Sequence, residues 1–73
     1  MPDSIIVTII YNQSSKDFSL PFDLPIKNWI EDLQTALMSP SLQLFYHDQL
    51  LDLQYSLKQY SIWDGAVLTA LSA

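Results

Sequence analysis

The first third of the chain has the pattern of two β-strands joined by a turn, and hydrophobic and polar residues alternate in the second of them. Residues 4–12 are β-branched almost throughout, and residues 12–15 have the composition of a turn. The next segment alternates between apolar and more polar residues. Phe18, Leu20 and Phe22 are expected on one side of a strand, and Asp17, Ser19 and Pro21 on the other. We therefore expect a hairpin whose pairing ends at Pro21, because proline has no N–H to donate to the ladder.

A helix is predicted after this hairpin. Its apolar residues recur at about the 3.6-residue period of an α-helix and are Ile26, Ile30, Leu33 and Leu37, flanked by Met38 and by Trp29 at the expected rim of the core. Pro25 stands where the first helical residue needs no N–H, and Pro40 is expected to end the helix. One amphipathic helix between hairpins has to bury its apolar stripe on a sheet, so the predicted fold class is α+β.

Turn signals organise the second half of the chain. Leu42 and Leu44 alternate with polar or aromatic neighbours and predict a strand, and His47 and Asp48 predict a turn. The apolar pair at residues 50–51 is too short for more than a stub strand.

The strongest turn signal lies near the end of the sequence. Asp64 precedes Gly65, the only glycine of the chain, which we expect at positive φ. Residues 66–71 then predict a final strand that closes the sheet. The expected architecture is a mixed sheet of four to five strands with one helix packed across it.

Composition limits the possible functions. The 73 residues are expected to form a single domain over positions 1–73, since 49% are apolar and only 15% are charged. Three lysines, no arginine and a net charge of -5 argue against nucleic acid or an anionic lipid surface as a partner. The sequence has no cysteine, no membrane-length apolar run and no leader pattern at Met1, so we expect a cytoplasmic protein.

Catalytic constellations are weak in this sequence. His47 stands beside Asp48, but no nucleophile elbow or glycine-rich oxyanion loop accompanies the pair. The carboxylate pairs Asp48 with Asp52 and Glu31 with Asp32 are interpreted as solvated surface charges. One histidine without cysteine does not make an ordinary structural zinc site. We therefore expect no enzymatic activity, no cofactor and no metal.

Two short motifs carry a family resemblance. Residues 24–28 (LPIKN) open the predicted helix, and residues 60–65 (YSIWDG) precede the last strand. Over nearly its whole length the chain resembles ubiquitin-like β-grasp proteins, and the two motifs are similar to the YukD/EsaB family of Gram-positive type VII secretion systems. The resemblance implies a cytosolic accessory or regulatory component of a membrane-embedded machine that exports small helical WXG100-type substrates. Protein partners within that machine are the expected ligands.

The last residues of the sequence argue against covalent conjugation to other proteins. Ubiquitin and the sulfur carriers are activated at a terminal Gly-Gly, whereas this sequence closes with Leu71-Ser72-Ala73. We therefore expect a non-conjugating interaction protein without covalent attachment to partners. The alternative function is a small non-catalytic subunit of a multicomponent enzyme such as an oxygenase, because β-grasp subunits also occur there.

The alternation also predicts a partner-binding surface. If Ile5, Val7 and Ile9 face the helix, their neighbours along the strand face outward and leave the open face of the sheet apolar. Such a patch on a small protein is typical of a partner site, unless the C-terminal residues or a second copy cover it. The candidate residues are Ile6, Ile10, Phe45, Val67 and Leu71 on this face, with Lys27 at the helix start and Trp63 in the last turn.

Overall fold

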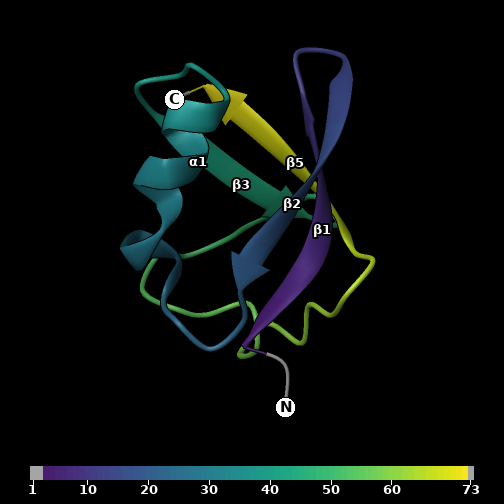
Figure 1. Ribbon diagram of the computed structural model, residues 1–73, viewed down its shortest axis with the longest axis vertical. Coiled ribbons are helices and arrows are strands. Elements are labelled where there is room, and N and C mark those ends of the chain that lie inside the picture. Colours follow the sequence, from purple (N-terminus) through teal and green to yellow (C-terminus); the bar gives the residue numbers. More distant parts are fainter. Residues whose placement is uncertain (1–2, 73) are drawn as a thin grey trace.

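The computed structural model describes residues 3–72, so the prediction for Ala73 and the reading of Met1 fall outside the described residues. Five strands, a 3₁₀ turn and one α-helix follow each other along the chain (Figure 1). Their bounds are β1 (Ser4–Tyr11), β2 (Ser14–Pro21), η1 (Ile26–Asn28), α1 (Ile30–Ala36), β3 (Leu42–Tyr46), β4 (Gln49–Leu50) and β5 (Val67–Ser72).

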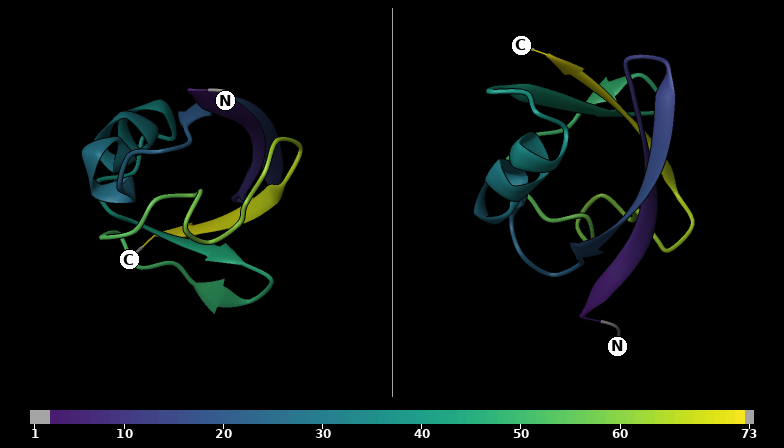
Figure 2. Two further views of the ribbon diagram at one scale, coloured as in Figure 1. Left: turned by 90° about the horizontal axis from the view of Figure 1, so that it is seen from below. Right: turned by 45° about the horizontal axis from the view of Figure 1, so that its top comes forward.

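The strands form one mixed sheet in the order β2-β1-β5-β3-β4. β1 and β5 are parallel, with Ile9 opposite Leu68, while the other pairs are antiparallel. α1 lies across one face of the curved sheet (Figures 1 and 2). The predicted α+β class, with a mixed sheet and one helix packed across it, is confirmed, and the number of strands is five.

The hairpin turn is shorter than the sequence indicated. Asn12 and Gln13 alone form it, at φ of 50° and 65°, and β2 already starts at Ser14. A two-residue loop with both residues at positive φ matches the right-handed twist of the flanking strands. Ser14 and Ser15 are therefore strand residues. β2 ends at Pro21, opposite Ser4, but the expected end of pairing there is not strict, because the next residue, Phe22, still donates its N–H to the Asp3 carbonyl at 3.0 Å.

The single continuous helix predicted from Pro25 was wrong. Pro25 precedes the 3₁₀ turn η1, and Trp29, at φ −133° and ψ 0°, separates η1 from α1. The backbone N–H groups of Ile26 and Lys27 donate to carbonyl oxygens of residues 55 and 53, each at 2.9 Å. The first turn is thus fixed to a distant segment, and a regular α-helix begins only after it.

The end of the helix also differs from the prediction. α1 stops at Ala36, well before Pro40, and Met38 adopts φ of 56° as the chain leaves the helix. Leu37 is half-buried against the core, whereas Met38 is 90% exposed and so does not belong to the buried stripe.

The last two strands are shifted by one residue from the predicted ones. The stub strand β4 comprises Gln49 and Leu50, with Leu51 buried just after it. β5 starts at Val67 rather than at Ala66. The turn predictions hold, because His47 and Asp48 lie at φ of 51° and 64°.

The core lies between α1 and the inward face of the sheet. Alternation assigned the strand contribution correctly, and the buried residues there include Ile5, Val7, Ile9, Leu42, Leu44, Leu68 and Ala70. Trp29 is part of this core rather than its rim, at 4% exposure. In the segment between β4 and β5, Tyr60 packs against the core, and its hydroxyl accepts the backbone N–H of Asp52 from the same segment at 2.6 Å.

Candidate functional site

An apolar patch occupies the face of the sheet that α1 does not cover. It is formed by alternate residues of β1 and β5, whose other side chains fill the core. Four of the predicted binding residues lie here, with exposures of 46% for Ile6, 39% for Ile10, 49% for Val67 and 51% for Leu71. The other residues between positions 3 and 72 leave these four side chains partly exposed.

The patch continues onto β3 and β4. Phe45 is half-buried and lies opposite Thr69 of β5 on one side and Leu50 of β4 on the other. Residues opposite each other in an antiparallel pair project to the same face. Leu50, 51% exposed, is therefore a sixth apolar member that the sequence interpretation missed. The two-residue turn at His47 and Asp48 was the available signal, because it fixes Leu50 opposite Phe45. We call these six residues the open-face patch: Ile6, Ile10, Phe45, Leu50, Val67 and Leu71.

Carboxylates border the open-face patch. Asp17 of β2 stands opposite Thr8, and its Oδ1 accepts the Thr8 hydroxyl at 2.6 Å. Asp64 lies beside Ile6, whose backbone N–H donates to the Asp64 Oδ1 at 2.6 Å. The border of the patch is thus negatively charged.

The three lysines all lie elsewhere. Lys16 stands opposite the inward-facing Ile9, so its side chain lies on the helix side of the sheet. Lys27 belongs to η1, and Lys58 lies between β4 and β5 with its Nζ 3.7 Å from the Asp23 carboxylate. The described open face therefore carries no basic side chain to meet a phosphate or an anionic headgroup.

Lys27 and Trp63 do not join the patch. The Lys27 Nζ donates to the Gln54 side-chain oxygen at 3.2 Å, so it is directed to the segment after β4 rather than to the sheet. Trp63 is 55% exposed, and its ring lies 4.9 Å from the buried Phe22 ring, at a tilt of 41°. The structure thus brings together five of the seven predicted residues and separates the other two.

A hydroxyl cluster joins the ends of β1 and β5. The Tyr11 hydroxyl lies 2.8 Å from the Ser72 Oγ, which lies 3.2 Å from the Ser39 Oγ. Hydrogen bonding by Ser72, and to a lesser extent by Ser39, lowers the pKa of Tyr11 below its ordinary value of 10.0, while burial opposes this shift.

The residues considered for catalysis lie apart from one another. His47 is exposed in the β3–β4 turn, with its ring edge-on to Tyr46 at 4.2 Å between centroids. Glu31 and Asp32 are exposed at the start of α1. Between residues 3 and 72, no three His, Asp or Glu side chains come close enough to hold a metal ion. None of the helices described there has the length and apolar character needed to cross a bilayer.

Solved structures with the same fold are numerous. The solution structure of an N-terminal ubiquitin-like domain matches with a TM-score of 0.88 at 20% identity, over 100% of this chain and 78% of that one. The EccD5 ubiquitin-like domain from Mycobacterium xenopi gives 0.81 at 19% identity, over 99% and 97% of the two chains. Ubiquitin of Caldiarchaeum subterraneum gives 0.82 at 12% identity, over 96% and 94%.

These identities establish the ubiquitin-like fold alone. None of the curated proteins compared with the chain matches it in sequence. A family model does match, over residues 4–69, and it describes protein YukD of the WXG100 protein secretion system. The match spans both motifs and all six residues of the open-face patch except Leu71. The chain therefore belongs to the YukD family of the WXG100 secretion system.

Proposed function

We propose that this protein is a non-catalytic, non-covalent interaction component of a WXG100 secretion system, in which it binds cytoplasmic parts of the export machine through the open-face patch. Membership of the YukD family supports the link to secretion. It also favours this function over the alternative of a multicomponent enzyme subunit. The proposed role is accessory or regulatory, and no cofactor is required for it.

The observation that carries the proposal is the exposure of the open-face patch. Ile6, Val67, Leu50 and Leu71 are each about half exposed, between 46% and 51%. They lie on strands whose pairing fixes their spacing, so a partner meets a preformed surface and no chain has to be ordered on binding. Exposed apolar residues gathered on one face of a small protein are typical of a binding site, and here Thr8 and Thr69 stand between them.

The charge distribution favours a protein partner. No described lysine belongs to the patch, and Asp17 and Asp64 lie at its border. A phosphate backbone would be repelled there, whereas an apolar protein surface flanked by Lys or Arg is complementary.

A matched pair of substitutions tests the proposal. Leu71 and Leu24 are leucines of similar exposure, 51% and 48%, but only Leu71 lies on the open face, whereas Leu24 lies in the loop between β2 and η1. Leu71→Lys is expected to weaken co-purification with membrane components of the machine and to reduce secretion of a WXG100-type substrate. Leu24→Lys introduces the same charge and is expected to leave both unchanged.

Circular dichroism of both variants separates loss of binding from loss of fold. The association is expected to disappear in denaturing gels, because it is non-covalent. If a folded Leu71→Lys variant still co-purifies and supports secretion as the parent does, the open-face patch is not the partner site. The segment around Lys27 and Trp29 then becomes the next surface to test.

A further inference from the structure

The outer edge of β2 offers unpaired backbone groups. The N–H of Phe22 donates to the carbonyl of Asp3 at 3.0 Å, which makes these two residues a hydrogen-bonded pair between the chain segments of β1 and β2. Such pairs alternate along an antiparallel ladder, so the even-numbered residues of β2 bond to β1. The N–H groups of Ser15, Asp17 and Ser19 therefore point away from the sheet, where residues 3–72 supply no further strand.

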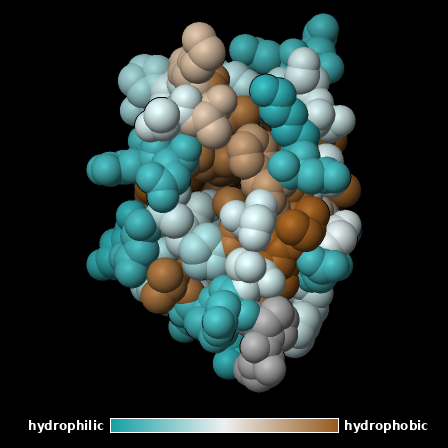
Figure 3. All heavy atoms as spheres, in the orientation of Figure 1, coloured by the Kyte–Doolittle hydropathy of each residue, from teal (hydrophilic) through white to brown (hydrophobic). Residues whose placement is uncertain are grey.

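An apolar hollow runs beside this edge. Figure 3 shows hydrophobic surface around a depression near the centre of the molecule, between the positions of α1 and the β1–β2 hairpin. A space of about 310 Å³ is lined by Phe18 and Leu20 of β2 and by Trp29, Asp32 and Leu33 at the start of α1. Side chains of an added strand that project to the helix side would enter this space.

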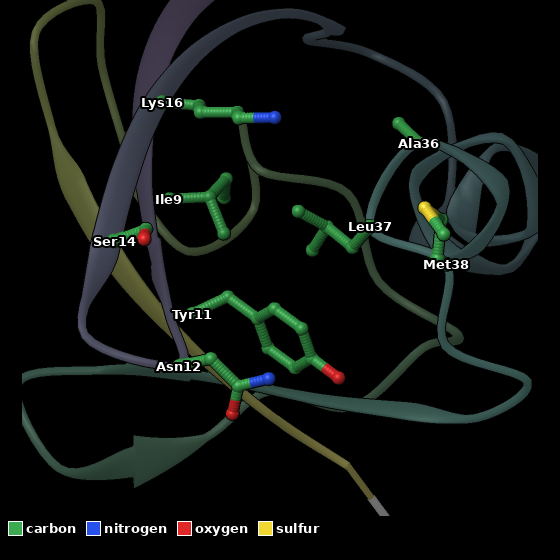
Figure 4. Close-up of a pocket in the computed structure, with 8 residues that line it drawn as sticks. All are labelled: Ile9, Tyr11, Asn12, Ser14, Lys16, Ala36, Leu37 and Met38. Atoms are coloured by element: carbon green, nitrogen blue, oxygen red, sulfur yellow. The ribbon is translucent and has the colours of Figure 1, made fainter.

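A second hollow lies closer to the hairpin turn. It encloses about 200 Å³ between Ile9 and Tyr11 on the sheet and Leu37 after α1, and these side chains point toward one another (Figure 4). The Lys16 side chain borders it. The two hollows together accompany β2 over most of its eight residues.

One wall of the first hollow contains an unsatisfied donor. The Trp29 indole Nε1 is buried and has no hydrogen-bond partner among the described residues. Leaving a buried donor without an acceptor is unfavourable. The indole N–H resonance of Trp29 therefore reports sensitively on any segment that enters the hollow.

Charge identifies the kind of chain that fits. Asp17 projects from β2 to the open-face side, and Asp32 is an exposed carboxylate at the hollow. The open-face side of an added strand would thus lie near Asp17, whereas its helix side would lie near Asp32 and, toward the hairpin turn, near Lys16, on a molecule whose net charge is -5. A second copy of this chain would bring another Asp17 to the same edge, so pairing with itself is disfavoured.

From these observations we infer that the β2 edge binds an extended segment of a partner protein as an added strand, with apolar side chains in the hollow beside α1 and Lys or Arg side chains toward Asp17. Backbone hydrogen bonds to the edge supply affinity, and the alternating side chains supply selectivity. This site is separate from the open-face patch, whose side chains project from the other face.

The test uses the full chain, labelled with ¹⁵N, and the capped synthetic peptide Lys-Val-Lys-Val-Lys-Val-Lys. Binding is expected to slow amide exchange at Ser15, Asp17 and Ser19 and to shift the Trp29 indole N–H resonance. Trp63, the only other tryptophan, lies in the loop before β5, and its indole resonance is expected to stay in place. The free protein is expected to sediment as a monomer.

Three controls address the backbone and the charge. Ser19→Pro removes one outward N–H but no backbone bond to β1, and it is expected to weaken the peptide about fivefold, the effect of one ordinary hydrogen bond. Ser19→Ala is its reference, because both substitutions remove the bond that the Ser19 hydroxyl donates to the Ser4 hydroxyl at 3.2 Å. A peptide with N-methyl groups on the edge-facing amides tests the same pairing without altering the protein. Replacing the peptide lysines by glutamate is expected to abolish binding.

The inference is overturned if the N-methylated or the glutamate peptide binds as well as the parent peptide. It is also overturned if the shifts fall on Ile10 and Leu71 instead of β2, or if the free chain dimerises through β2. None of these results requires the proposed secretion partner, so the two proposals fail independently.

Discussion

The backbone of Ile6 is bound on both sides by residues that lie nearly sixty positions later in the sequence. Its N–H donates to the Asp64 carboxylate at 2.6 Å, and its carbonyl accepts the N–H of Gly65 at 2.8 Å. The turn before β5 is thus fixed to β1 immediately before their parallel pairing begins, with Thr8 opposite Val67. These two bonds set the register that places Ile6 and Val67 together on the open face.

The first prediction concerns the Asp64 carboxylate. Asp64→Ala removes the acceptor for the Ile6 N–H, and we expect it to lower the free energy of unfolding by about 1 kcal/mol. Asp64→Asn keeps an acceptor oxygen and should lose less. Urea unfolding followed by tryptophan fluorescence measures both, and an Ala variant with the midpoint of the parent would show that the bond does not contribute to stability.

The second prediction concerns Gly65. Its φ is +89°, and a Cβ built there meets no atom within 4 Å, so the cost of a side chain comes from the backbone conformation alone. We expect Gly65→Ala to destabilise the fold by about 1–2 kcal/mol. Gly65→Asn should cost less, because asparagine tolerates positive φ better. Equal stability of the parent and both variants would contradict this explanation.

The third prediction concerns the core under the helix. Leu33 is 2% exposed, and Leu33→Ala should cost about 2–5 kcal/mol through lost burial and a residual cavity. For a chain of this size the melting temperature should fall by at least about 8 °C. Leu24→Ala is the control, since Leu24 is 48% exposed. A Leu33→Ala variant that melts within a degree or two of the parent would mean that Leu33 does not pack as described.

Local patterns predicted most of the fold because they act over a few residues. The period of two in β1 determined that Ile5 faces the core and Ile6 faces outward, and both assignments are confirmed. The only glycine marked the turn before β5, where its φ is positive as predicted.

What the sequence did not predict depends on contacts between distant segments. The helix is interrupted at Trp29, after η1 has been fixed by backbone bonds from Ile26 to Tyr55 and from Lys27 to Leu53. No periodicity near residue 26 contains that information. Strand order has the same origin, since β2 becomes an edge only because β5 occupies the other side of β1.

The residues predicted for the binding surface also fall into two groups, according to whether a local pattern located them. Its strand residues were found by alternation, whereas Lys27 and Trp63 came from a motif resemblance and a turn, and the structure places them apart from the patch. The hollow between β2 and α1 was not predicted, because no local sequence pattern specifies the relative position of these two elements.

The last prediction concerns the hydroxyl cluster at Tyr11. The pKa of Tyr11 is lowered chiefly by Ser72 and secondarily by Ser39, because hydroxyl donors favour the phenolate form. Ser72→Ala should therefore raise the pKa of Tyr11 toward 10.0, and Ser39→Ala should raise it less. NMR titration of ¹³C-labelled tyrosine measures each shift.

The same cluster predicts a dependence of stability on pH. The folded chain releases the Tyr11 proton at lower pH than the unfolded chain does, so between the two pKa values the unfolded state binds more protons and stability increases with pH. The contribution is complete above the unfolded value of 10.0 and is lost as pH falls through the folded pKa. Urea unfolding over this alkaline interval should show a smaller increase for Ser72→Ala than for the parent. Identical pH profiles would mean that the Tyr11 and Ser72 hydroxyls are not bonded in solution.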